Sequence, residues 1–158
     1  MSSFIMTYFR FDTRKWACVE RFSNADGSTI WSVAASSRFL AVGADSGVVN
    51  LYDDSLPSSS VYQPSKQPIK SIMNMQTSAN VLSFNGDGQI LAMCSRKTKD
   101  MLKLVHVPSR TVFSNWPTLR TPLGYAWSLD FSPDNQYLAI GNTRGKCLLY
   151  NLKHYSNK

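Results

Sequence analysis

Residues 126–152 read AWSLDFSPDNQYLAIGNTRGKCLLYNL, and this stretch decides the fold of the chain. Apolar side chains alternate with small or polar ones over residues 126–131, a pattern that indicates a β-strand. Residues 132–135 and 142–145 then supply the Pro, Asp, Asn and Gly residues that favour tight turns. The stretch therefore predicts three antiparallel strands in a meander. Such a meander buries little core by itself, so further copies of it must pack against it.

The central strand of this meander has two earlier copies in the chain. Residues 39–43 (FLAVG), 90–94 (ILAMC) and 137–141 (YLAIG) share one pattern, at intervals of roughly 50 residues. The strands before and after each copy also recur. Four short strands in such an interval are typical of a β-propeller blade, whereas leucine-rich repeats are shorter and helical arrays lack this strand pattern. We therefore predict an all-β fold, a partial β-propeller.

The predicted strands amount to about three and a half four-stranded blades, fewer than the roughly four to eight of closed propellers. We expect the chain in isolation to aggregate or to pair with a completing partner, because repeat arrays need covered ends. The Ser- and Pro-rich residues 54–68 are expected to form a long surface loop. The predicted units are residues 1–28 as the third and fourth strands of an incomplete blade, 29–75 and 76–117 as two blades, and 118–158 as a final blade lacking its outer strand, plus a tail.

Composition limits the class of protein. The hydrophobic content of 43% over 158 residues is enough for one domain-sized core. No apolar run approaches about 18 residues, so no membrane partner is expected, and no signal peptide is evident. Cys18, Cys94 and Cys147 are widely spaced without a Cys-x-x-Cys pair, which supports neither a disulfide framework nor a zinc site. Because each lies in a predicted strand, we expect buried free thiols.

The net charge of +7 admits a nucleic-acid partner without proving one. In a propeller, the turns between second and third strands share one face with the connections between blades. The balance of charge on this face is similar to that on the other loops, so charge selects neither face, and each cation is either a contact or a solvated loop residue. The four tryptophans are expected in the interblade core, with base stacking as the alternative. The possible RNA or protein contacts on the shared face are Arg96, Lys97, Lys99, Arg120 and Arg144.

No catalytic, cofactor-binding or metal-ligating residue is predicted. A hydrolase needs a nucleophile, a base and an orienting acid, and the two histidines, His106 and His154, sit in no recognisable motif. Residues 85–88 (NGDG) lack the sequel of a phosphate-binding loop and the alternating acids of a calcium loop, so they are interpreted as a hairpin turn, as are residues 132–135. The sequence therefore favours a non-enzymatic protein without a cofactor.

Two sets of residues resemble a known family. The Phe-Ser-Pro-Asp run at residues 131–134 and the Leu-Ala-x-Gly strands look like degenerate WD repeats, with Tyr52-Asp53 and Tyr150-Asn151 at the place of the Trp-Asp dipeptide. The degeneracy weakens the usual buried side-chain network of such blades. More specific strings closely resemble the C-terminal propeller half of the U3 small nucleolar RNA-associated protein 18 family, from Asp12 onward. These strings lie at residues 47–52, 68–74, 104–109 and 111–117, and at 141–142 together with 145–155.

The resemblance implies a non-catalytic scaffold subunit of the UTP-B subcomplex in the small-subunit processome. Its expected partners are other WD-repeat subunits of UTP-B, together with pre-rRNA and the U3 snoRNP, reached directly or through those subunits. The expected location is the nucleolus, within the nucleus, and the expected process is pre-rRNA processing in ribosome biogenesis. The alternative is a general WD-repeat adaptor, for example one that recruits substrates to a ubiquitin ligase. Contact candidates are the segments 54–68, 96–100 and 118–124.

Overall fold

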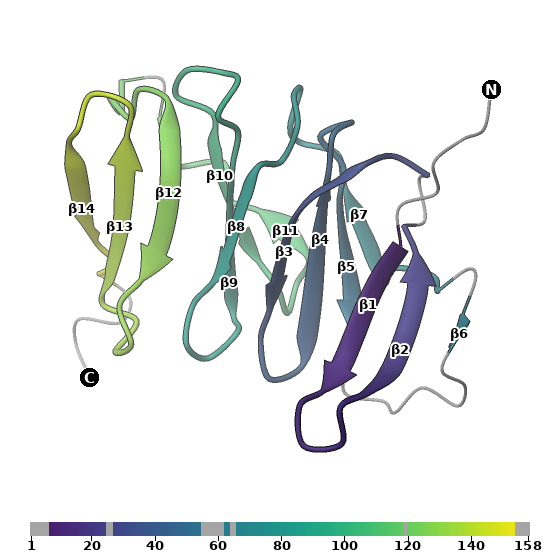
Figure 1. The fold of residues 1–158 in the computed structure, drawn as a ribbon. Helices are drawn as coiled ribbons and strands as arrows, with labels where there is room; N and C mark the ends of the chain where they lie inside the picture. The colour runs from purple at the N-terminus through teal and green to yellow at the C-terminus, as the bar shows by residue number, and fades with distance from the viewer. Residues whose placement is uncertain (1–6, 25–26, 55–61, 64–65, 119, 154–158) are drawn as a thin grey trace.

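A computed structural model describes residues 7–24, 27–54, 62–63, 66–118 and 120–153. These residues form fourteen β-strands in four sheets that stand side by side (Figure 1). The described part of the chain contains no helix long and apolar enough to cross a membrane. The predicted all-β, partial propeller fold is therefore confirmed.

The four sheets follow one another along the chain. Sheet A holds β1 (Thr7–Asp12), β2 (Ala17–Ser23) and β6 (Tyr62–Gln63). Sheet B holds β3 (Ile30–Ala35), β4 (Phe39–Ala44), β5 (Val49–Asp53) and β7 (Lys70–Ile72). Sheet C holds β8 (Val81–Phe84), β9 (Ile90–Cys94), β10 (Leu102–His106) and β11 (Thr111–Val112). Sheet D holds β12 (Ala126–Phe131), β13 (Tyr137–Asn142) and β14 (Cys147–Asn151).

The hairpin turns form where the sequence predicts them. In the turn between β8 and β9, the Gly88 amide donates to the Asn85 carbonyl at 3.0 Å. In the turn between β12 and β13, the Asn135 amide donates to the Ser132 carbonyl at 2.9 Å. The two turns also meet, because the Gly86 amide donates to Asn135 Oδ1 at 2.7 Å. Sheets C and D are thus joined at their turns as well as through their faces.

The segment after β5 differs from the prediction of a plain surface loop. Two of its residues form β6, which pairs in parallel with β2 of the preceding sheet. Beyond β6, Lys66 Nζ lies 2.6 Å from the buried Glu20 carboxylate of β2. Before β6, Asp54 Oδ1 lies 2.6 Å from Arg10 Nη1 of β1. The segment therefore ties sheet B back onto sheet A through two ion pairs, one of them largely buried.

Side chains from neighbouring sheets fill three hydrophobic clusters. Leu40 and Val42 of β4 pack toward sheet A with Phe22, whereas Ala41 between them packs toward sheet C. In β9, Leu91 and Met93 join the cluster with sheet B, and the alternate side chains join the cluster with sheet D. The central strands of sheets B and C are therefore buried on both faces. This two-sided burial explains why they read as continuous apolar runs.

The outward face of sheet D is open in the described structure. Leu149 of β14 pairs with Ala139, as Leu51 pairs with Ala41 and Leu104 pairs with Ala92 in the other sheets. The two equivalent leucines are buried between sheets, but Leu149 is 64% exposed. At the opposite end, Phe9 and Phe11 of β1 in sheet A are also exposed. The expected association with a completing partner remains a prediction.

The cysteines differ from the prediction of buried thiols. Cys94 is buried between sheets C and D, and burial raises the pKa of its thiol to about 12. Cys18 is half-buried, and Cys147 is exposed. The prediction is wrong for Cys147 because β14 turns this side chain to the open face of sheet D. A strand assignment alone does not tell which faces are covered.

We expect Gly43→Ala to destabilise the fold more than Gly141→Ala. A Cβ added at Gly43 would lie 2.8 Å from the Ala79 carbonyl oxygen, which belongs to the connection into sheet C. At the equivalent Gly141, an added Cβ meets only the Ser128 side chain. Overpacking of this kind costs about 1–3 kcal/mol in the free energy of unfolding. Thermal unfolding followed by circular dichroism checks this difference, and equal melting temperatures for the two variants would contradict the close approach of sheets B and C.

We also expect the thiols to react in the order of their exposure. At pH 8, iodoacetamide should modify Cys147 in the native chain and spare Cys94, which reacts only after denaturation. The raised pKa of Cys94 also has a consequence at high pH. From about pH 9 to about pH 12, the unfolded thiol ionises while the folded thiol stays protonated, so stability should fall as the pH rises. Peptide mass mapping measures the modification, and a Cys94→Ser variant should remove its part of the pH dependence.

Candidate nucleic-acid interface

The predicted contact residues lie at one end of the sheets, which we call the loop face. The loop face consists of the turns β4–β5, β9–β10 and β13–β14 and the connections between sheets. Connections and turns are hydrogen-bonded to each other there: the Asp45 amide donates to the Thr29 carbonyl at 2.8 Å, and the Asp100 amide to the Gly124 carbonyl at 2.7 Å. Arg96, Lys97 and Lys99 all lie in the β9–β10 turn. Backbone hydrogen bonds therefore hold this end of the molecule together.

Lys97 reaches from sheet C across to sheet B. Its Nζ lies 3.1 Å from Asp45 Oδ1 and 5.8 Å from the centroid of the Trp31 ring. The Trp31 indole N–H donates to the same carboxylate oxygen at 2.8 Å. One carboxylate therefore fixes both the edge of the indole ring and the ammonium group beside it.

Arg96 reaches in the opposite direction, toward sheet D. Its guanidinium carbon lies 4.7 Å from the centroid of the Trp127 ring, and its Nε donates to the Trp127 carbonyl at 3.1 Å. The Arg96 amide in turn donates to Asn80 Oδ1 at 3.0 Å, which holds the turn against the start of β8. No ion pair joins Arg96 to an acid within the described part of the chain. The guanidinium group is therefore held by an aromatic face and a carbonyl, without a neutralising carboxylate.

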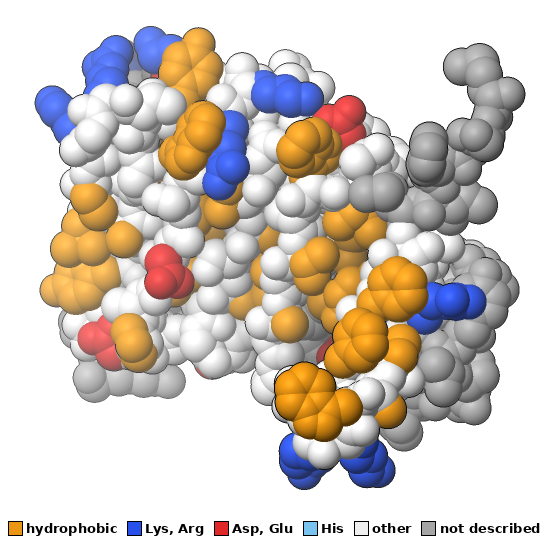
Figure 2. Space-filling view, in the orientation of Figure 1, with side chains coloured by type: hydrophobic (Ala, Val, Ile, Leu, Met, Phe, Trp, Pro, Cys, Tyr) orange, Lys and Arg blue, Asp and Glu red, His pale blue; other side chains and the backbone are white. Residues whose placement is uncertain are grey.

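Together these four side chains form a surface that we call the aromatic–cationic row. It runs from Trp31 through Lys97 and Arg96 to Trp127, across sheets B, C and D. Figure 2 shows hydrophobic and basic side chains side by side at this end of the molecule, above β12 and β3. A cation beside an indole ring is attracted by the ring's negative face. The two tryptophans at its ends are thus 96 positions apart in the sequence, and the two cations between them come from one turn.

The exposure of the tryptophans corrects the prediction that they form interblade core. Trp31 is 54% exposed, Trp127 is 52% exposed and Trp16, in the β1–β2 turn, is 87% exposed. Only Trp116 of the four packs against a hydrophobic cluster, with sheets C and D. The physical reason is a register shift that leaves Trp31 between Ile30 and Ser32 without a partner on β4.

The same register shift leaves Trp127 without a partner on β13, between Ala126 and Ser128. A bulged residue turns out of the ladder, so its side chain leaves the face that the alternation assigns to it. The sequence does carry one sign of this shared feature, because a Trp-Ser dipeptide occurs near the start of both β3 and β12. Exposure at an equivalent position in two repeats indicates a common feature of the fold rather than an isolated surface residue.

The other predicted contact residues lie outside the row. Lys99 forms a long ion pair, 4.0 Å from Asp100 of the same turn. Arg144 lies in the β13–β14 turn, and Arg120 lies in the connection between sheets C and D. Neither arginine forms an ion pair with a residue that the structure describes. His154, the second histidine of the chain, lies outside the described residues.

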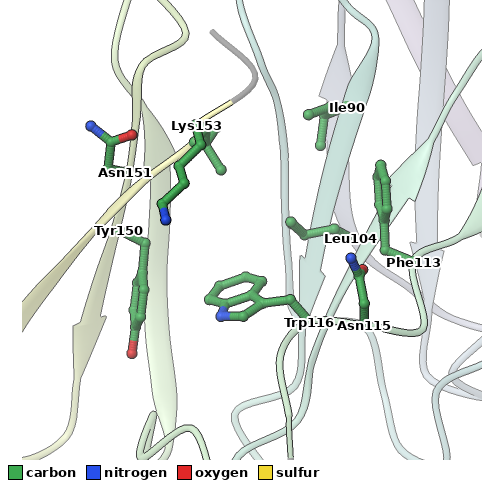
Figure 3. A pocket seen from close by; sticks show the side chains of 9 residues that line it. Ile90, Leu104, Phe113, Asn115, Trp116, Tyr150, Asn151 and Lys153 are labelled. Carbon is green, nitrogen blue, oxygen red and sulfur yellow. The ribbon is translucent and has the colours of Figure 1, made fainter. Parts of the chain in front are cut away.

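A cleft of about 380 Å³ lies between sheets C and D beside β14. Figure 3 shows its side chains, with Tyr150 beside β14 and the Trp116 ring directed toward it from the side of sheet C. The ring centroids are 4.9 Å apart, and burial raises the pKa of the Tyr150 phenol. Lys153 is the one charged side chain in its lining. The lining offers apolar packing and no acid, base and nucleophile set.

Metal binding has no support in the described part of the chain, where no three His, Cys, Asp or Glu side chains come together as a metal site would need. His106, at the end of β10, hydrogen-bonds through Nδ1 to Ser109 Oγ at 2.7 Å and packs edge-on against Phe113. These contacts account for the histidine structurally.

The chain is similar to one family of repeats and to several known proteins. The WD domain, G-beta repeat family matches residues 117–151. Proteins named U3 small nucleolar RNA-associated protein 18 or its homologue are 42% identical in mouse, over 92% of this chain, and 48% identical in Saccharomyces cerevisiae, over 75% of it. The human homologue is 40% identical over 92% of this chain. The chain covers 26%, 20% and 26% of these relatives, respectively, and so spans about a quarter or less of their length.

A solved structure of the mitotic checkpoint complex contains a chain of similar fold. The TM-score is 0.71, and the match covers 95% of this chain and 43% of that chain. The identity of 14% limits this finding to the fold. It agrees with the propeller arrangement of sheets A to D.

Proposed function

The chain is homologous to the U3 small nucleolar RNA-associated protein 18 family, and from this premise we propose that it is a non-catalytic scaffold in ribosome biogenesis. The observation that carries the proposal is identity of 40–48% to relatives in mouse, yeast and human over three quarters or more of this chain. We propose UTP-B of the small-subunit processome as the assembly and the nucleolus as the location. Partners would be other WD-repeat subunits of UTP-B, with pre-rRNA and the U3 snoRNP.

The fold supports a scaffold role through its rigidity. The central strands of sheets B and C are buried on both faces, so the loops at their ends are held at fixed positions relative to one another. A rigid frame that presents loops from several sheets suits recognition by contacts spread over a surface. Such recognition does not need a pocket with catalytic groups.

The basic residues of the loop face are the proposed contacts with the pre-ribosomal particle. Arg96, Lys97, Lys99, Arg120 and Arg144 lie in turns and connections on this face. Cations that neutralise phosphates release counterions, so such contacts contribute affinity that falls with salt. The excess of basic over acidic residues in the whole chain, +7, favours a polyanionic partner over a basic one.

A charge reversal tests this proposal. We expect the triple variant Arg96→Glu, Lys97→Glu, Lys99→Glu to reduce co-sedimentation with particles that contain U3 snoRNA by about tenfold or more, because attraction to phosphates becomes repulsion. The matched control is Arg14→Glu, Lys15→Glu, which reverses two cations in the β1–β2 turn at the opposite end of the sheets.

Sedimentation profiles probed for U3 snoRNA measure the association, and imaging measures nucleolar location. Unchanged co-sedimentation of the triple variant would remove the β9–β10 turn from the contact surface. Absence of the unsubstituted chain from U3 particles and from the nucleolus, with ubiquitin-ligase subunits captured instead, would replace the proposed function by the adaptor function.

A further inference from the structure

We propose that the aromatic–cationic row binds single-stranded RNA, with unpaired bases stacked on Trp31 and Trp127 and phosphates held by Arg96 and Lys97. The choice of RNA as the ligand rests on the proposed function, whereas the mode of binding rests on the row itself. The ligand class is an unpaired segment, because bases in a duplex are already stacked on one another and do not offer their faces to a protein.

The first argument is that the two indoles are large apolar groups kept in water by a repeated backbone feature. Aromatic side chains are strongly stabilised by burial, yet Trp31 and Trp127 remain more than half exposed. The bulges that turn them outward occur at the same point of two repeats. Stacking a base on such an exposed flat ring lowers the free energy, and every base has a flat face that can stack.

The second argument is that the rings are already held in place before any ligand binds. The indole N–H of Trp31 is bonded to Asp45, and Lys97 lies beside the ring. The Arg96 guanidinium lies over the Trp127 ring, and its Nε donates a hydrogen bond to the Trp127 carbonyl. A side chain fixed in advance loses little conformational entropy on binding. The row is therefore organised for stacking in the free protein.

The third argument is the order of groups along the row. The two cations are neighbours in one turn and lie between the two rings, so a strand laid along the row meets a ring, two cations and a ring. Aromatic platforms interleaved with basic side chains are the usual means by which proteins bind single strands without reading sequence. Lys97 is paired with the Asp45 carboxylate, whereas Arg96 has no acidic partner among the described residues, which leaves it available to a phosphate. An acidic peptide would match the charges but would leave the two ring faces unused.

Binding of fluorescein-labelled oligouridylate by the full 158-residue chain tests the proposal. A length of about 12 nucleotides lies within the roughly 4–16 that single-strand sites occupy. Trp31→Leu and Trp127→Leu should each weaken binding by about 5- to 150-fold, the equivalent of about 1–3 kcal/mol for one stacked base. Trp31→Phe and Trp127→Phe should retain most of the affinity because a phenyl ring still stacks. The matched control is Trp16→Leu, which removes a more exposed indole at the opposite end and should change nothing.

The salt dependence separates stacking from charge. Trp→Leu variants should keep the slope of log affinity against log salt concentration, whereas Arg96→Gln and Lys97→Gln should each reduce it by about 0.7. Quenching of tryptophan fluorescence by the RNA, reduced in each of the Trp31→Leu and Trp127→Leu variants and unchanged in Trp16→Leu, would report the stacking directly. Circular dichroism and melting curves identify any variant that fails to fold, and the Phe variants test the same ring positions with a conservative change.

Each outcome decides between alternatives. Undiminished oligouridylate binding by both Trp→Leu variants, or equal loss in Trp16→Leu, would overturn the stacking. Equal affinity for a duplex of the same length would also overturn it, as would polyglutamate binding with the same dependence on Trp31 and Trp127. If the chain binds no oligouridylate but still co-sediments with U3 particles, the stacking proposal fails while the proposed function stands. Loss of both would overturn the two together.

Discussion

Burial of each sheet between two neighbours is the constraint on which the rest of the structure depends. A four-stranded sheet has two faces and can cover neither by itself. The chain solves this by repeating one strand in which bulky and small side chains alternate, so that Leu40 and Val42 fill one interface while Ala41 allows close approach at the other. Where a neighbouring sheet is lacking in the described structure, as beside Leu149, the same pattern leaves an apolar side chain in water.

Much of the fold could be predicted from the sequence, because alternation and repetition act locally. The sheets and hairpins follow from period-two patterns and from turn residues, whose effect does not need distant partners. Two features could not be predicted in this way. The two-residue strand β6 exists only because β2 offers an edge on another part of the chain. The exposure of Cys147 depends on whether another sheet covers sheet D, which no property of β14 itself determines.

The candidate site was predicted in part. Loop positions placed Arg96 and Lys97 on the shared face, but Trp31 and Trp127 were expected in the interblade core because they lie in predicted strands. A bulge of one residue reverses the side to which a side chain points, and a pattern with period two carries no sign of where a bulge occurs. Sheet B also contains buried side-chain hydrogen bonds that the sequence did not predict. Although the signature residues of strong repeats are missing, the buried Asn50 amide donates to Asn24 Oδ1 at 2.9 Å and its oxygen accepts from Ser71 at 2.7 Å.

The hydrogen bonds that join Asn24, Asn50 and Ser71 also bear on the aromatic–cationic row of the loop face. Buried amides that satisfy each other fix strands and connections in a single arrangement, which an apolar core alone specifies less strongly. The turns that grow out of these fixed strands therefore keep their positions, and the β9–β10 turn can send adjacent side chains toward different sheets. A surface assembled from three sheets keeps its geometry only if the sheets do not slide. The packing between sheets thus supports the aromatic–cationic row as directly as the contacts within it do.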